Sequence, residues 1–185
     1  NMKCMRDLNN PCRVFACNGE RGVTMCAWAD PEHKPAIPIP YSEEVMTGFE
    51  YAFAGSLLQC GMEREALDVV SAIRARYVGK LRNPFSEIEC GASYARAMAS
   101  YALLMIYSGF RFDMTRGMLG FRPMRSGQYF WSADGAWGTV QLCDTSLRLS
   151  VLYGDIALKC LEHPLPCAST VSLNGRPVGF DSGDG

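Results

Sequence analysis

The hydrophobic pattern of this 185-residue sequence changes at Gly109, so one kind of secondary structure cannot account for both sides of that position. Before Gly109, apolar residues recur at helical spacing, and the glycine itself provides a stop for the last helix. After it, short runs rich in β-branched and aromatic residues alternate with turn residues. We therefore predict a helical middle with β segments on both sides, in a chain that is part of something larger.

Three helices are predicted in the middle of the chain, over about 42–59, over 63–77 and in a segment that ends at 107 or 108. Ser42 is suited to cap the first helix because its hydroxyl can accept a backbone N–H. Glu44 and Glu50 are expected at the positive end of the helix dipole or on a solvated face. The apolar stripe of this helix is expected at positions about one turn apart, Val45, Phe49, Phe53 and Leu57.

Short β-strands are predicted on both sides of the helices. Residues 13–17 and 23–28 have the pattern of a hairpin around a glycine-bounded loop, and Asn174-Gly175 is the strongest hairpin signal in the chain. Between them, β-like runs occupy 128–131, 139–143, 147–152 and 156–161. We accordingly predict a lead-in with a hairpin (1–30), a helical part (31–110) and a β-rich, truncated C-terminal segment (111–185).

Composition excludes several classes of function. The net charge of −1 provides no basic surplus for nucleic acid, and the longest apolar run, 97–107, is too short to span a bilayer. Nine cysteines without a C-x-x-C pair, together with only two histidines, argue against a zinc site. Scattered reduced thiols instead favour a reducing cytoplasm, and no residue pattern requires a metal or an organic cofactor.

Residues 83–98 concentrate two acids, a tyrosine and an arginine between a proline and a long apolar helix, and such groups are costly to bury unless they bind something. The segment contains Asn-Pro-Phe-Ser-Glu-Ile-Glu-Cys-Gly, and Tyr-Ser-Glu-Glu-Val-Met-Thr-Gly-Phe-Glu (41–50) and Arg-Tyr-Val-Gly-Lys (76–80) precede it. Over about residues 12–137, these ordered motifs resemble the C-terminal part of the catalytic region of glycoside hydrolase family 116. That family includes non-lysosomal glucosylceramidases and bacterial β-glucosidases.

The resemblance implies a full-length enzyme that folds as an α/α barrel of six helical hairpins. The chain is then expected to be mainly α, as a fragment of that barrel followed by short C-terminal β-strands. The resemblance also implies a retaining mechanism with a glutamate nucleophile and an aspartate general acid/base. In the family both carboxylates lie well upstream of the matched motifs, so we expect no catalytic residue in this chain and no activity from the isolated fragment. The implied partner is a β-glucoside or a glucosylceramide-like substrate.

By position, the resemblance assigns sugar binding in the −1 subsite to Glu87 and Arg96 and, by a weaker carry-over, to Glu44. Glu89 is expected to cap a helix, to pair with an arginine or to support the sugar-binding residues, and Ser93 is a further supporting position. The sequence departs from the family pattern twice. Met46 stands where the family usually has tryptophan, and Ser93 where it often has histidine.

The residues alone constrain how Glu87 and Arg96 can act together. On one continuous helix, their separation of nine residues would place them on opposite faces. A helix capped by Ser93 instead leaves Glu87 in a loop and puts Arg96 in the first turn, where both can face one sugar. The competing start is Ser86 with Glu89 as its capping-box partner, which produces a solvated face. An ordinary Glu87–Arg96 salt bridge is a further alternative.

Two tryptophans are further candidates for sugar binding, and the sequence leaves two alternative functions open. Trp131 and Trp137 are candidates for stacking on sugar, with core packing as the alternative. A second enzyme hypothesis makes Glu87 the general acid and Glu89 the base, although near neighbours in sequence rarely lie about 5 to 9 Å apart across a substrate. The non-enzyme alternative is an α/α scaffold or a carbohydrate-binding protein that shares the family fold without its activity.

Overall fold

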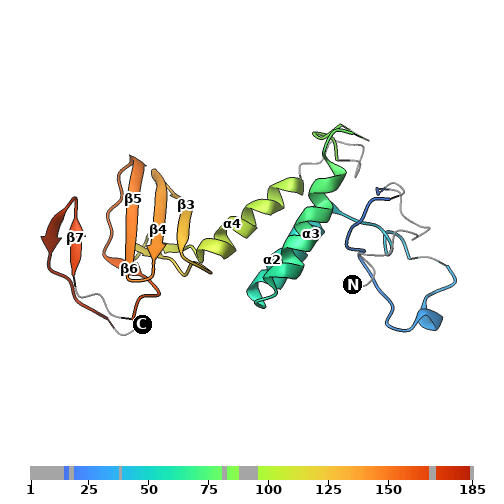
Figure 1. Cartoon of the computed structure of the whole chain (residues 1–185), viewed down its shortest axis with the longest axis horizontal. Coiled ribbons are helices and arrows are strands. Elements are labelled where there is room, and N and C mark those ends of the chain that lie inside the picture. The colour runs from blue at the N-terminus through green and yellow to red at the C-terminus, as the bar shows by residue number, and fades with distance from the viewer. Residues whose placement is uncertain are drawn as a thin grey trace. The chain divides into compact units, whose positions relative to one another are not determined.

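The computed structural model describes residues 15–16, 19–37, 39–80, 83–87, 96–166 and 170–183, and the chain forms two compact units. Unit 1 is Asn1–Leu103 and unit 2 is Leu104–Gly185. Figure 1 labels α2, α3 and α4 and strands β3 to β7. Among the described residues, no helix is both long and apolar enough to cross a membrane.

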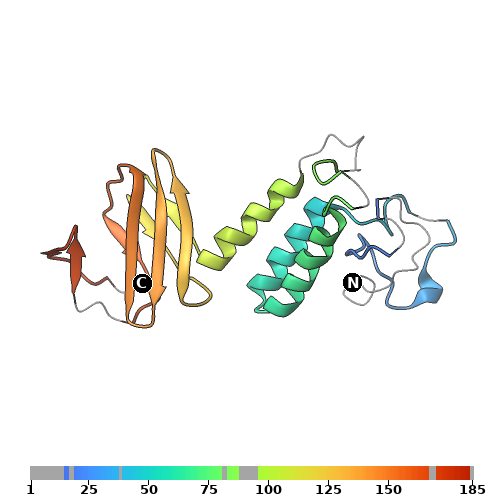
Figure 2. The same ribbon diagram turned by 45° about the horizontal axis from the view of Figure 1, so that its top comes forward.

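Unit 1 is built around an antiparallel pair of helices. These are α2 (Thr47–Gln59) and α3 (Glu63–Arg76), which lie side by side in Figure 2. They are joined by a tight turn in which Gly61 adopts a positive φ of 74°, a conformation that glycine reaches without steric cost. The predicted second helix and its short connection to the first are thereby confirmed.

The predicted start of α2 is wrong. The helix begins at Thr47 with Met46 as its N-cap, not at Ser42. Residues 42–45 are instead paired with residues 24–26: Val45 bridges Thr24, the N–H of Met25 donates to the carbonyl of Glu44, and that of Cys26 donates to Ser42. Residues 24–26 therefore pair with the segment that precedes α2, whereas the predicted hairpin partner, residues 13–17, lies mostly outside the described residues.

Three more short helices lie in the described residues, of which the last, α4, begins in unit 1 and ends in unit 2. The proline-rich connector contains a 3₁₀ helix, η1 (Pro31–His33), capped by the Asp30 side chain. A second 3₁₀ helix, η2 (Arg96–Ser100), leads directly into α4 (Tyr101–Ser108). The predicted stop of the third helix is confirmed, because Gly109 follows with a φ of 58°.

The described residues of unit 2 form three small sheets. In the first, β2 is antiparallel to β1 and parallel to β6; the second is the antiparallel meander β3-β4-β5; the third is a hairpin of β7 and β8. The hairpin turns at Asn174-Gly175, as predicted, with both residues at positive φ. The strand bounds are β1 Arg111–Asp113, β2 Met118–Gly120, β3 Gly127–Ala133, β4 Ala136–Cys143, β5 Ser146–Gly154, β6 Cys160–Glu162, β7 Val171–Leu173 and β8 Arg176–Val178.

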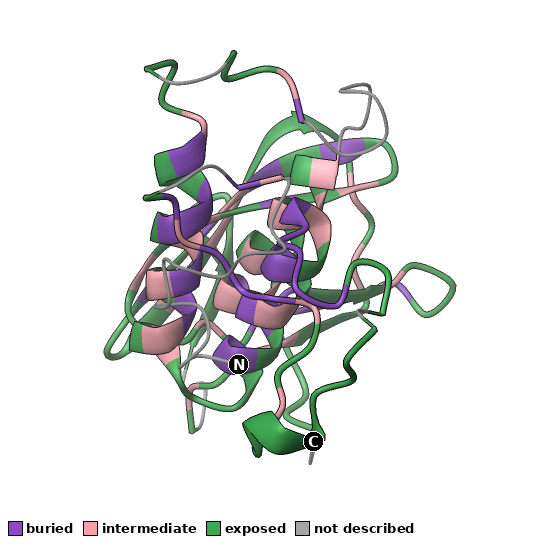
Figure 3. Cartoon of the chain, turned by 90° about the vertical axis from the view of Figure 1, so that its right-hand side faces the viewer, coloured by how far each residue is buried: buried purple, intermediate pink, exposed green. Residues whose placement is uncertain are grey.

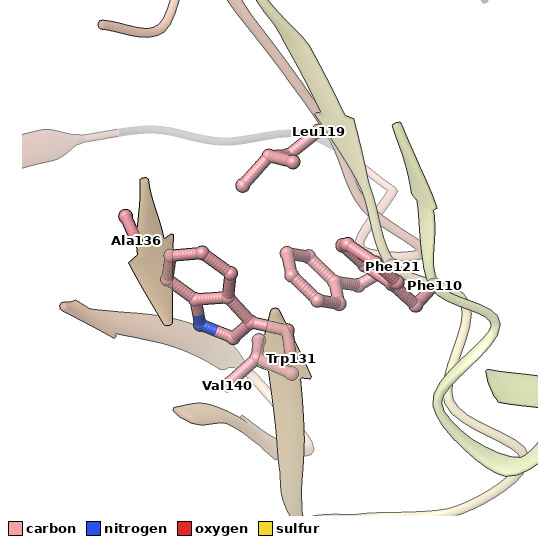
Figure 4. Packing of buried hydrophobic residues seen from close by; sticks show 6 residues of the cluster. All are labelled: Phe110, Leu119, Phe121, Trp131, Ala136 and Val140. Atoms are coloured by element: carbon pink, nitrogen blue, oxygen red, sulfur yellow. The ribbon is translucent and has the colours of Figure 1, made fainter. Parts of the chain in front are cut away.

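The core of unit 2 joins the first two sheets. Trp131 on β3 and Val140 on β4 are buried in one apolar cluster with Leu119 on β2 and the following Phe121 (Figure 4). Because strand residues alternate between the two faces, this cluster uses one face of β3-β4-β5 and leaves the other face outside the core.

The predicted fold class is wrong: the described structure is a mixed α and β fold, not a fragment of an α/α barrel. Helix and strand occupy nearly equal shares of the described residues, 28% and 27%. These residues form a single helical hairpin, α2–α3, where a barrel requires a succession of them. Unit 2 buries its apolar residues between sheets, so its stability does not depend on a helical layer.

One buried ion pair ties three segments of unit 1 together. Arg76 of α3 and Glu50 of α2 pair through side chains that are only 2% and 1% exposed. Glu50 Oε1 also accepts the N–H of Val23 at 2.9 Å, and Arg76 donates to the carbonyl of Arg21 at 2.7 Å. Between those two residues, a Cβ on Gly22 would lie 2.8 Å from both charged groups, so only glycine fits.

Glu50 therefore does not lie on a solvated face, and the predicted apolar stripe is only partly right, because Val45 and Leu57 are buried but Phe49 is not. Phe49 is half exposed, whereas Tyr51, Ala54 and Leu58 are buried with Glu50. Figure 3 shows buried and exposed positions alternating around the helices. The helix is rotated relative to the expectation because burying Glu50 against Arg76 satisfies both charges and draws the 21–23 loop onto α2 and α3.

We predict that Glu50→Gln lowers the free energy of unfolding of unit 1 by about 3–5 kcal/mol, because it leaves Arg76 as an uncompensated buried charge. The matched control is Glu162→Gln, which breaks an Arg111–Glu162 pair whose side chains are 59% and 41% exposed. That change should cost less than about 1 kcal/mol. Amide hydrogen exchange of peptides from α2 and α3, and from β2 and β6, measures each unit separately. Equal losses in the two variants would contradict the assigned role of burial.

Candidate functional site

Glu87 and Arg96 come together at the start of η2. Glu87 belongs to the described loop 83–87, and its side chain is buried. One carboxylate oxygen accepts the backbone N–H of Arg96 at 3.1 Å, and the other accepts that of Ala97 at 2.7 Å. The first N–H groups of a helix have no partner within the helix, so Glu87 caps η2 from nine positions upstream.

This geometry bears on the two predicted helix starts. Ser86 and Glu87 are not helical, which disfavours a helix capped by Ser86, and residues 88–95 lie outside the described residues. Glu87 lies outside the helix and Arg96 is its first residue. Ser93 and Glu89, the other predicted contributors, lie outside the described residues.

The Arg96 side chain packs on the first turn of α2. A Cβ on Gly48 would lie 3.1 Å from the Cβ of Arg96 and 3.2 Å from its Cδ, so the small residue allows close approach. The guanidinium carbon lies 5.6 Å from the centroid of the Phe49 ring, within the range of a cation–π contact. Gly48 and the half-exposed Phe49 therefore fix Arg96 at the N-terminal end of α2.

Glu44 lies just before α2 and is also buried. Its Oε1 accepts the N–H of Phe15 at 3.1 Å and that of Val45 at 3.3 Å. The carboxylate is thus engaged with the backbone of the paired segments, and it is not on a solvated face. Met46, which stands where the resembled family usually has tryptophan, is buried and provides no surface for a sugar.

Two further side chains, the acid Glu43 and the phenol Tyr77, make contacts near the start of α2. Glu43 pairs with Lys34, whose Nζ lies 6.0 Å from the ring centroid of Trp28. Thr47 Oγ1 and the hydroxyl of Tyr77 lie 3.0 Å apart. The described part of the chain contains no group of three His, Cys, Asp or Glu side chains that could hold a metal ion.

Sequence reasoning missed the roles of Tyr51 and of the Glu50–Arg76 pair. Burial raises the pKa of Tyr51 above its ordinary value of 10.0, and the charges of Arg74 and Arg76 oppose this shift. A signal was present in the sequence, because Tyr51, Ala54 and Leu58 are also spaced by one helical turn. A helix that buries this stripe also places Glu50 at the edge of the buried face, where its charge requires a basic partner.

The two tryptophan candidates have different environments. Trp131 is buried in the core of unit 2, whereas Trp137 is exposed on the opposite face of the same sheet. Core packing accounts for Trp131, and only Trp137 is open to a ligand. No model of a known protein family matches the chain, and no curated protein matches it either.

We predict that Glu87→Ala destabilises the start of η2 by about 2 kcal/mol, because two hydrogen bonds to a charged acceptor are lost. Glu87→Gln retains one acceptor oxygen and should lose about half as much. Exchange rates of the Arg96 and Ala97 amides measure the effect directly. The control is Asn83→Ala, which removes only the hydrogen bond from the N–H of Phe85. Unchanged protection of Arg96 and Ala97 in Glu87→Ala would show that Glu87 is not their cap.

We also predict that unit 1 loses stability as the pH rises above about 10. The pKa of Tyr51 is higher in the folded than in the unfolded chain, so the unfolded state ionises first. The contribution is fully present below the unfolded pKa and is lost as the pH passes through the folded one. Urea denaturation between pH 8 and 11.5, compared with Tyr51→Phe, measures the slope. An identical slope in Tyr51→Phe would contradict the assignment.

Proposed function

We propose that this chain belongs to a retaining β-glycosidase of the β-glucosidase or glucosylceramidase type, to which it contributes sugar-binding residues. The observation that carries the proposal is the hydrogen bond from the Arg96 backbone to the Glu87 carboxylate. It places the Glu87 carboxylate beside the backbone of Arg96, whose guanidinium lies over Phe49 in the first turn of α2. Carboxylate oxygens accept hydroxyl protons and guanidinium groups donate, which are the two functions that recognition of a sugar hydroxyl requires.

The neighbouring groups support a sugar pocket. Each Glu87 oxygen accepts one backbone N–H and has a second lone-pair direction for a sugar hydroxyl. Arg96 is held by the half-exposed ring of Phe49, and an aromatic face also suits the C–H side of a pyranose. A substrate without the matching hydroxyls would leave these polar groups unpaired, so the arrangement favours specificity.

The catalytic steps are assigned to residues beyond this chain. In a retaining glycosidase one carboxylic acid donates a proton to the leaving group and a second carboxylate attacks the sugar. Both Glu87 oxygens accept backbone N–H groups, an arrangement that suits a hydrogen-bond acceptor better than a proton donor. Glu44 also accepts two backbone N–H groups, both through Oε1. We accordingly assign Glu87 to binding and not to proton transfer.

A reducing, cytoplasmic setting is part of the proposal. Four described cysteines, Cys26, Cys60, Cys143 and Cys160, are exposed and free of disulfide bonds. Exposed thiols persist where glutathione and thioredoxin keep them reduced, and they tend to pair in oxidising compartments.

The test is Glu87→Gln in the full-length protein, assayed with an aryl β-glucoside. We expect the Kd for the sugar to rise about ten- to hundredfold, with residual turnover, because one charged hydrogen-bond partner becomes neutral. Glu65→Gln makes the same chemical change in the first turn of α3 and should have little effect. The 185-residue chain alone should not hydrolyse the glucoside.

Three results would contradict this function. Restoration of turnover in Glu87→Gln by azide would make Glu87 catalytic, and robust hydrolysis by the chain alone would place the catalytic carboxylates within it. Sugar binding without any turnover by the full-length protein would favour the non-catalytic carbohydrate-binding alternative.

A further inference from the structure

The outer face of the β3-β4-β5 sheet carries a row of exposed aromatic rings. Phe130, Trp137 and Tyr153 come from three successive strands and are 54%, 41% and 65% exposed. The ring centroid of Trp137 lies 6.2 Å from that of Phe130 and 6.2 Å from that of Tyr153. These residues alternate with Trp131 and Val140, whose side chains enter the core, so the rings lie on the opposite face.

A register shift in β5 sets the order of this row. Gly138 pairs with Val151, but the preceding Trp137 pairs with Tyr153, so Leu152 is an extra residue. Without the shift, Leu152 would lie opposite Trp137 and Tyr153 would belong to the other face. The bulge thus places an aromatic ring beside Trp137 where regular pairing would place an aliphatic side chain.

The other paired positions of this face are polar and nearly uncharged. In register with the rings stand four hydroxyl side chains, two amides, one thiol and one guanidinium, and none of these positions carries an aliphatic or acidic side chain. They are Ser132, Thr139, Ser146, Ser150, Gln128, Gln141, Cys143 and Arg148.

We propose that this face binds a neutral oligosaccharide of β-linked glucose units. Aromatic rings stack on the C–H faces of pyranoses, while amides and hydroxyls both donate to and accept from sugar hydroxyls. An open sheet face suits an extended chain of sugars better than a single ring. The choice of β-linked glucose rests on the proposed function, whereas recognition of a neutral saccharide rests on the face itself.

The charge and composition of the face select this occupant over others. A nucleic acid or an acidic glycan needs several cations, and Arg148 is the only one at the paired positions of this face. Protein interfaces are enriched in aromatic residues and arginine but depleted in serine, and three of the paired positions of this face are serines. A neutral polyhydroxylated ligand suits a face that carries almost no charge and that combines aromatic rings with amides and hydroxyls.

The experiment measures binding of cellohexaose to the full chain by isothermal titration calorimetry. Trp137→Ala and Phe130→Ala should each weaken binding about tenfold or more. The control is Phe180→Ala, which removes an exposed ring of the same unit that lies outside this face. The near-ultraviolet circular dichroism of the buried Trp131 verifies that each variant is folded.

A Glu87→Gln variant separates this proposal from the function proposed above. Loss of binding in Trp137→Ala but not in Glu87→Gln supports the sheet face, whatever the role of Glu87. Loss in Glu87→Gln alone overturns the sheet face and leaves the glycosidase proposal standing. The sheet face is also overturned if the wild-type chain binds no cellohexaose, or if Trp137→Ala changes only self-association in sedimentation equilibrium.

Discussion

Unit 1 depends on the buried contact between Glu50 and Arg76. An ion removed from water is costly unless it is paired and hydrogen-bonded, so each side chain makes the other necessary. The pair joins α2 to α3, and its hydrogen bonds hold the loop around Gly22 against both helices. It thereby fixes the rotation of α2 about its axis. Because Arg96 packs on the first turn of that helix, the geometry of the candidate site depends on the same contact.

The parts of the structure that could be predicted from the sequence are those with local signals. Helix α3 has a complete apolar stripe, α4 has a glycine stop, and Asn174-Gly175 dictates a two-residue hairpin. The strands β3, β4 and β5 are close to their predicted positions and extend by a few residues at their ends. In the candidate site, the position of Glu87 outside the helix followed from the spacing of nine residues, because a continuous helix would have separated Glu87 from Arg96.

The parts that could not be predicted depend on partners far away in the sequence. Ser42 is a good N-cap by its chemistry, but pairing of its segment with residues 24–26 delays the helix to Thr47. The burial of Glu50 depends on Arg76, 26 residues away. The barrel was expected from a likeness of motifs, and motifs describe a site more directly than the layers around it. The Glu87 cap escaped prediction because capping side chains are ordinarily sought within three residues of a helix start.

The close fit of Gly22 against two charged groups has a consequence for the evolution of this chain. A relative that replaced Arg76 with an apolar residue would retain an isolated buried acid unless Glu50 changed as well. Position 22 would have room for a side chain only after both had become smaller, and only if Val45, whose Cγ1 would lie 2.5 Å from that Cβ, had given way as well. Positions 22, 50 and 76 are therefore expected to covary, although 28 residues separate the first two and 26 separate the last two. Gly22 is expected to be the last of the three to change.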